Sequence, residues 1–198
     1  MAEDVSSVHP HTTLRTTMKA QRAALSAAQR VYCAQAVARH LFDSQALGAA
    51  SRIAGYWAIA GELPLNAVAA RISAPASYLL PRLAPEGQLR FAPWAPTVEL
   101  LPNRYGIPEP DIALADCLGP DQLDVVLVPL LAFDLQGNRL GMGGGWYDRS
   151  FAFRLHGQPM PLLIGIGYAF QQVDALAAQT WDVPLDAVVT ERGYLRLR

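Results

Sequence analysis

Five glycines lie within nine residues between Gly137 and Gly145, in a stretch that also carries charged and aromatic side chains. Glycine lets the main chain approach a ligand closely, and successive N–H groups in such a loop can form a concave anion site. Arg139 adds a fixed positive charge whose fork of donors matches phosphate oxygens. A flexible linker lacks bulky residues, whereas this loop leads into the segment 146–149, Trp-Tyr-Asp-Arg. The segment therefore predicts a phosphate-binding loop.

The common nucleotide signatures do not match this loop. Lys19 is the only lysine in the chain, so no G-x-x-x-x-G-K-[ST] motif is present near the glycines. No G-x-G-x-x-G pattern occurs at the loop or at Gly165–Gly167. A helix expected after Asp148 would add its positive N-terminal end to the anion site. The residues alone thus predict an anion site without saying which anion it binds.

Helices and buried strands alternate along the chain and would position this loop. Apolar residues at helical spacing from Thr12 to about Leu47 predict two helices, divided at Ser26 as an N-cap. Apolar runs such as 53–59, 125–131 and 162–167 predict buried strands. This alternation indicates an α/β fold: a three-layer domain with a mainly parallel central sheet, Rossmann-like in its connections.

Ligands of parallel sheets usually bind at the carboxyl ends of the strands. Glu62, the glycine loop and Tyr168 each follow a predicted strand, so one common site is expected. Two further segments carry weaker signals. Residues 100–110 are predicted to be a loop held by prolines, and residues 173–179 a short helix.

Composition limits the class of protein. Of the 198 residues, 52% are hydrophobic and 17% are charged, which is typical of one globular domain. We expect this domain over residues 11–198, after a disordered tail of residues 1–10. A net charge of −1 provides no general attraction for nucleic acid or for an acidic membrane. Two isolated cysteines, no signal peptide and no long apolar run indicate a cytoplasmic protein, which we expect to be monomeric.

The glycine loop resembles the signature loop of the 5-formyltetrahydrofolate cyclo-ligase family, also called 5,10-methenyltetrahydrofolate synthetases. Its sequence is Gly137-Asn-Arg-Leu-Gly-Met-Gly-Gly-Gly-Trp-Tyr-Asp-Arg149. Weaker family anchors follow in the same order over about residues 11–190, namely Leu14-Arg15, Gly61–Leu65, Pro129–Asp134 and Trp181–Asp186. The resemblance implies a single cyclo-ligase domain with an isomerase/CoA-transferase-like topology.

The resemblance also implies a reaction. ATP, as co-substrate with Mg²⁺, would phosphorylate the formyl oxygen of 5-formyltetrahydrofolate. N10 of the same molecule would then attack the activated carbon, and phosphate would leave as the 5,10-methenyl ring closes. A formamide oxygen is a poor leaving group, and phosphorylation makes it a good one. The protein must align the γ-phosphate with that oxygen and neutralise the developing charge.

Family positions assign roles to individual residues. Arg139 and Tyr147 would be catalytic. The glutamate expected to bind the folate is Glu62, and Asp148 and Asp182 would hold Mg²⁺, a cation that prefers carboxylate oxygens beside phosphates. The implied ATP-binding set is His11, Arg15, Arg139, Leu140, Gly141, Met142, Gly143, Gly144, Gly145, Trp146 and Tyr147. The implied folate-binding set is Trp57, Glu62, Met142, Gly143, Gly144, Gly145 and Trp146.

Each role has a structural alternative. Asp148 could be the N-cap of the following helix, and Asp182 a turn residue. Glu62 could be a simple loop acid, Trp57 a core aromatic, and Arg139 part of a surface ion pair.

Two positions depart from the family pattern, since His11 replaces the usual lysine and Trp146 the usual phenylalanine or tyrosine. These departures keep open a non-catalytic folate- or nucleotide-binding protein. A third possibility is a sugar-phosphate isomerase or acyl-transfer enzyme on a related sheet.

Overall fold

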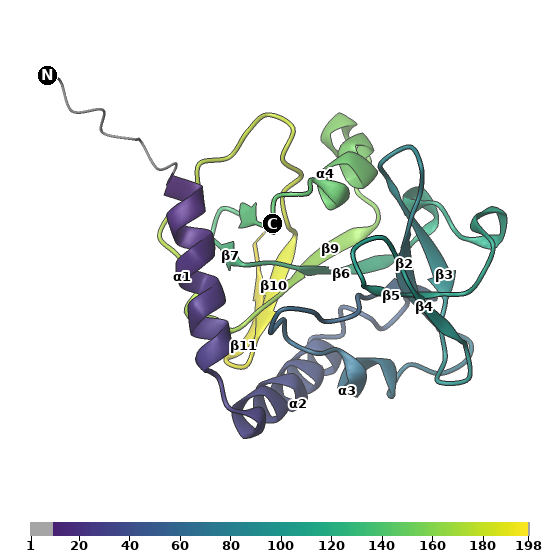
Figure 1. Cartoon of the computed structure of the whole chain (residues 1–198), viewed down its shortest axis with the longest axis horizontal. Coiled ribbons are helices and arrows are strands. Elements are labelled where there is room, and N and C mark those ends of the chain that lie inside the picture. The colour runs from purple at the N-terminus through teal and green to yellow at the C-terminus, as the bar shows by residue number, and fades with distance from the viewer. Residues whose placement is uncertain (1–9, 198) are drawn as a thin grey trace, which may run out of the picture.

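The computed structural model describes residues 10–197, arranged around one seven-stranded sheet with the order β11-β10-β9-β6-β1-β2-β3 (Figure 1). Five neighbouring strands are parallel, and β3 and β11 are antiparallel edges. The strands are β1 (Arg52–Ala54), β2 (Ser77–Leu83), β3 (Leu89–Pro93), β6 (Val125–Pro129), β9 (Leu162–Ile166), β10 (Ala187–Thr190) and β11 (Gly193–Arg196). The predicted mainly parallel α/β fold is confirmed.

Helices cover both faces of the sheet. They are α1 (Pro10–Ala24), α2 (Ala27–Asp43), α3 (Asn66–Ala69) and α4 (Trp146–Phe151), with short 3-10 turns at Leu114–Asp116, Pro120–Gln122, Ala152–His156 and Ala169–Gln171. Figure 1 shows α2 and α3 on one side of the sheet and α4 on the other. No described helix is long and apolar enough to cross a membrane. The expected tail of residues 1–10 lies outside the described residues except for Pro10, which begins α1.

The central strand β6 shows how the sheet is buried on both faces. Its residues Val125 and Leu127 pack in the cluster that includes α2, whereas Val126 and Val128 pack with Phe151 of α4 on the other side. Successive side chains of a strand point to opposite faces, so a strand covered by helices on both sides must be apolar throughout. This is why the continuous apolar run correctly predicted a central strand.

The two N-terminal helices are divided as predicted. Ser26 caps α2, because the amide N–H of Gln29 donates to its hydroxyl and the Gln29 side chain accepts from the Ser26 N–H. This reciprocal capping box satisfies two donors that a helix start otherwise leaves free. The turn lets α1 leave the α2 layer and pack through Met18 against Leu131 and Leu140, next to the glycine loop.

The strand order changes direction between β1 and β6. From β1 the chain builds outward through β2 and β3, then returns to the other side of β1 and builds β6, β9 and β10. A crevice opens at the carboxyl ends of the strands at such a switch point, and it is the usual ligand site of open α/β sheets.

Two local predictions are wrong. Residues 100–110 form a hairpin of β4 (Leu100–Pro102) and β5 (Pro108–Pro110), because the Asn103 side chain accepts from the N–H groups of Tyr105 and Ile107 and closes the turn. Residues 173–179 are not helical, because tertiary contacts take their N–H groups: Val173 donates to a carbonyl and Leu176 to a carboxylate elsewhere in the chain.

Candidate active site

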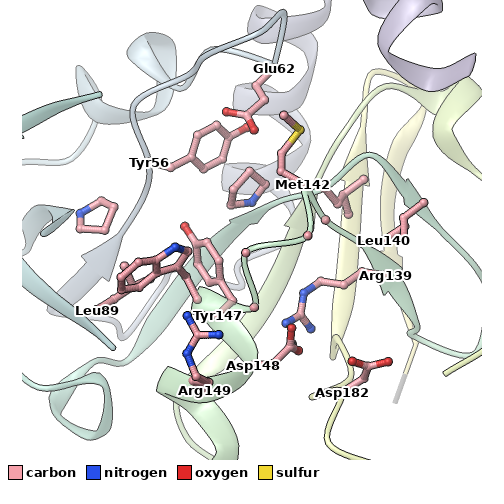
Figure 2. Close-up of a pocket in the computed structure, with 18 of the residues that line it drawn as sticks. Tyr56, Glu62, Leu89, Arg139, Leu140, Met142, Tyr147, Asp148, Arg149 and Asp182 are labelled. Atoms are coloured by element: carbon pink, nitrogen blue, oxygen red, sulfur yellow. Dashed lines mark hydrogen bonds and ion pairs between the residues drawn. The ribbon is translucent and has the colours of Figure 1, made fainter. Parts of the chain in front are cut away.

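A cavity of about 520 Å³ lies at the carboxyl ends of β1 and β6. Figure 2 shows Glu62 and Tyr56 at one end of it, and Arg139, Asp148 and Asp182 at the other. Every residue to which a role was assigned lines this cavity: His11, Arg15, Trp57, Glu62, Arg139, Leu140, Gly141, Met142, Gly143, Gly144, Gly145, Trp146, Tyr147, Asp148 and Asp182. Residues more than 170 positions apart in the sequence therefore meet in one crevice.

The glycine loop follows β8 (Arg139–Leu140), which pairs with β7 (Ala132–Phe133) in a small separate sheet. The N–H groups of Met142, Gly143 and Gly144 donate to no described residue. Gly145 precedes α4 with φ +64°, a left-handed conformation that glycine adopts without strain. The loop thus presents free main-chain donors toward the cavity, as an anion site requires.

Arg139 is held by two contacts at the edge of the loop. Its guanidinium pairs with the Asp148 carboxylate and also donates to the Val183 carbonyl. The same Asp148 oxygen, Oδ1, accepts from the Val183 N–H at 3.1 Å. Only 7% of the Arg139 side chain is exposed, whereas 26% of the Asp148 side chain is. Arg139 therefore does form an ion pair, but with another charged residue of the cavity rather than with a group elsewhere on the surface.

Asp148 is not an N-cap. Helix α4 begins at Trp146, so Asp148 is its third residue, and Gly145 occupies the cap position without a side-chain bond. Oδ2 of Asp148 accepts no hydrogen bond from the described part of the chain, and it borders the cavity beside the glycine loop. One carboxylate oxygen is therefore free to bind a cation.

Helix α1 delivers a second arginine to the loop. Arg15 donates from Nε to the Gly141 carbonyl at 3.0 Å, and its guanidinium lies next to Gly143. His11 stands one turn earlier on the same helix and lines the same cavity. The terminal nitrogens of Arg15 make no bond to a described residue, so they can meet an anion held by the loop.

Glu62 is buried at the opposite end of the cavity. Its Oε2 accepts from the Ile59 N–H at 3.1 Å. Burial raises the pKa of the Glu62 carboxyl, while the Ile59 N–H and the positive charge of Arg22 act in the opposite direction. Nearby Tyr56, which sequence reasoning missed, donates to the Leu63 carbonyl and shapes this end of the site.

Tyr147 lies between the two ends of the cavity. Burial, and then the negative charge of Glu62, raises the pKa of Tyr147 above its ordinary value. The phenol therefore stays protonated at neutral pH, and it can donate a hydrogen bond but cannot act as a base.

Asp182 lies in a turn, where its Oδ2 accepts from the Gln179 N–H at 2.8 Å. The turn alternative therefore holds, although the residue also borders the cavity. No group of three or more potential metal-ligating side chains occurs within residues 10–197. Magnesium sites that use substrate phosphates need only one or two carboxylates, so the residues present fit such a site.

Trp146 forms one wall of the cavity together with the β4–β5 hairpin. The guanidinium groups of Arg104 and Arg149 lie 5.4 and 5.1 Å from its ring centre, and the Tyr105 ring meets it edge-on at 6.4 Å. The hairpin lines the cavity through Asn103, Tyr105, Ile107, Pro108 and Glu109, which sequence reasoning missed. Asn103 and Gly106, three positions apart and flanked by two prolines, were the available turn signal.

One weaker expectation fails, because Tyr168, expected at the common site, is in the hydrophobic core, stacked on Phe170, and does not line the cavity. Trp57 lines the cavity and meets Trp94 edge-on, but it is only partly buried and belongs to none of the core clusters, so the core-aromatic alternative does not describe it.

Asp134, the last residue of the anchor Pro129–Asp134, organises the approach to the loop. It is fully buried, and its oxygens accept from the N–H groups of Gln136, Asn138 and Leu176 and from the Asn138 side chain. This turn leads directly into Arg139.

Asp134→Ala would leave four donors without their acceptor. We expect the free energy of unfolding to fall by about 2 kcal/mol, with a smaller loss in Asp134→Asn. Denaturant titration measures both. An unchanged midpoint in the alanine variant would mean that the turn holds without the carboxylate.

Comparison with known proteins gives a consistent result. The model of the 5-formyltetrahydrofolate cyclo-ligase family matches residues 8–191. The 5-formyltetrahydrofolate cyclo-ligase of Haemophilus influenzae is 35% identical over 175 residues, covering 87% of this chain and 92% of that protein. The Escherichia coli enzyme of the same name is 35% identical over 176 residues, covering 87% and 96%. The solved Aquifex aeolicus 5,10-methenyltetrahydrofolate synthetase is similar with a TM-score of 0.80 and 29% identity, covering 95% and 93%.

Proposed function

This chain belongs to the 5-formyltetrahydrofolate cyclo-ligase family, and from that premise we propose that its cavity binds the folate and ATP side by side across the glycine loop. The family reaction converts 5-formyltetrahydrofolate to 5,10-methenyltetrahydrofolate with ATP, so the protein is an ATP-dependent ligase of folate metabolism. The proposal concerns how its own residues perform that reaction.

In the proposed mechanism the formyl oxygen attacks the γ-phosphorus of ATP, and the bond from that phosphorus to the ADP oxygen breaks. N10 then attacks the formyl carbon and passes its proton to the phosphate, and inorganic phosphate leaves with the former formyl oxygen. The product is the 5,10-methenyl ring, with ADP and phosphate released. Little of this chemistry needs a protein base, so alignment and charge stabilisation are the main tasks of the site.

The glycine loop and two arginines would bind the triphosphate. Free N–H groups of Met142, Gly143 and Gly144 offer donors to the phosphate oxygens, and Arg15 lies beside Gly143. Arg139 would act on the transferred phosphoryl group, moving part of its fork from the Val183 carbonyl to phosphate. Its pair with Asp148 would keep the guanidinium oriented, so that little reorganisation accompanies the reaction.

Magnesium would be bound by the free Oδ2 of Asp148, with Asp182 in a supporting role. The ion would neutralise charge on the phosphates. Glu62 and the ring of Trp57 would bind the pterin, because a carboxylate can accept two hydrogen bonds from an amino-pyrimidine edge. The Tyr147 phenol would donate to an oxygen of either substrate.

One observation carries the proposal: a single cavity has a glycine loop with unbonded main-chain N–H groups at one end and a buried carboxylate at the other. A nucleotide-binding protein has no need of the second feature, and a folate-binding protein has no need of the first. We also propose that residues 11–198 form one catalytic domain, acting as a monomer in the cytoplasm, where the buried thiols of Cys33 and Cys117 stay reduced.

A direct assay tests the proposal. Purified protein, 5-formyltetrahydrofolate, ATP and Mg²⁺ are combined, and the near-UV absorbance of the methenyl product is followed together with ADP. We expect product only when ATP is present, one ADP for each product, and loss of turnover on chelation that added Mg²⁺ restores. Bound folate without product would favour the non-catalytic alternative, and product without ATP would exclude the mechanism. Turnover that survives chelation would reject the role of magnesium and leave the rest of the proposed mechanism standing.

A further inference from the structure

Arg22 is a buried charge that the proposed mechanism does not use. It lies in the last turns of α1, outside the cavity, and its side chain is 2% exposed. Its Nη2 donates to the Leu130 carbonyl, at the end of β6. Nε and Nη1 have no hydrogen-bond partner among the described residues. Burying two such donors is unfavourable, so a compensating electrostatic interaction is expected nearby.

The turn that carries Glu62 packs directly against this arginine. Gly61 has φ +75°, and a Cβ placed on it would lie 3.3 Å from the Arg22 Cβ and 2.8 Å from Nη1 of Arg30. Arg30, from α2, donates to the Arg22 carbonyl at 2.6 Å and to the Leu25 carbonyl at 3.2 Å. Two arginines from two helices thus enclose the turn that precedes Glu62.

We propose that Arg22 is a positioning residue for folate binding: it packs against the turn that carries Glu62, places a buried positive charge beside that turn, and through its bond to Leu130 fixes α1 and the turn to the strand end. This inference rests on the proposed role of Glu62. Arg22 does not touch the substrate, and it acts through the carboxylate that does.

The electrostatic surroundings of Glu62 support this role. Burial raises the pKa of Glu62, whereas the Ile59 N–H and Arg22 lower it. The other titratable groups that interact with Glu62 are Tyr56, after β1, and Tyr147, on α4. Burial raises the pKa of both phenols, so they are neutral near pH 7. Among the described residues, Arg22 is therefore the cationic group that offsets the burial of Glu62.

The test measures the dissociation constant of 5-formyltetrahydrofolate against pH, without ATP, by quenching of tryptophan fluorescence. The ionised carboxylate binds, so affinity falls as pH drops through the Glu62 pKa. Arg22→Gln keeps a donor for Leu130 but removes the charge, so the Glu62 pKa rises. The acidic limb, meaning the part of the pH profile where affinity falls, then moves to higher pH. We expect about tenfold weaker binding on that limb, with recovery at alkaline pH. Arg22→Lys keeps the charge and should leave the limb near its wild-type position.

Arg154→Gln is the control, because Arg154 is a largely shielded arginine, 11% exposed, that is paired with Asp186 at 2.7 Å away from the cavity. It should lower stability without moving the limb. The inference is overturned if Arg22→Gln leaves the limb in place, or if Arg22→Lys moves it as far as glutamine does.

Glu62→Gln separates a failure of the Arg22 inference from a failure of the proposed function. If that variant binds folate normally, the proposed role of Glu62 itself is wrong. Weaker folate binding by Glu62→Gln, with an unmoved limb in Arg22→Gln, rejects only the role of Arg22.

Discussion

Arg139→Ala is expected to lower kcat/KM for ATP by roughly 10²- to 10³-fold while the dissociation constant of 5-formyltetrahydrofolate changes little. Arg139 is the cation on the glycine loop, shielded from water and held by Asp148, so alanine removes a preoriented charge from the position proposed for the transferred phosphoryl group. The folate end of the cavity, around Glu62, makes no bond to it. Steady-state kinetics with each substrate varied in turn, together with folate binding measured without ATP, separates the two effects.

Two further variants sharpen this experiment. Arg139→Lys keeps the charge but loses the fork geometry, so it should recover only part of the activity. Arg52→Ala is the matched control, because Arg52 also pairs with an aspartate, Asp124 at 3.2 Å, but does not line the cavity. It should leave both kinetic constants near wild type. Equal loss of ATP and folate binding in Arg139→Ala would contradict the division of the cavity into two ends.

Glu62→Ala is expected to have the reverse effect, raising KM for 5-formyltetrahydrofolate by about 10²-fold with a much smaller change for ATP. A buried carboxylate that accepts from the pterin edge would be lost, and the donors of the bound ligand would face an apolar wall. Because burial raises the Glu62 pKa, the wild-type affinity should already decline as pH falls through that pKa, whereas the alanine variant should lack this dependence. Folate binding measured across pH checks both points.

Glu109 is the matched control for this prediction. It is buried to the same degree and also lines the cavity, but its Oε1 already accepts from the Leu83 N–H and the Asn103 side chain. Its role in this structure is to hold the hairpin. Glu109→Gln should therefore raise the folate KM far less than Glu62→Ala. A larger effect at Glu109 would mean that Glu109, on the hairpin side of the cavity, and not Glu62 is the carboxylate that binds the folate.

Sequence reasoning predicted those features whose cause is local. The glycine loop is recognisable because several of its positions have a positive φ that glycine adopts without strain, as at Gly143 with φ +101° and Gly145 with φ +64°. Strand β6 is recognisable because a strand covered on both faces must be apolar throughout, and Ser26 because an N-cap and its partner lie three residues apart. The order of weak anchors along the chain then indicated the family.

Errors arose where partners distant in the sequence determine the local conformation. Residues 173–179 carry a helical pattern, yet Leu176 donates to the carboxylate of Asp134, 42 positions away, and the helix is lost. The β4–β5 hairpin depends on a turn closed by the Asn103 side chain and on Glu109 bridging to β2. Such contacts leave no periodic trace in the sequence.

The amino-acid sequence by itself determined the fold class, the family and the glycine-loop and charged residues assigned to the cavity, because backbone freedom, burial pattern and motif order are local or linear properties. Only the tertiary structure decided how those residues are paired. It joined Arg139 to Asp148, left one Asp148 oxygen free, and buried Arg22 behind the turn that carries Glu62. Charge pairing and burial depend on distances between elements brought together by folding, and these distances set how strongly each charge acts.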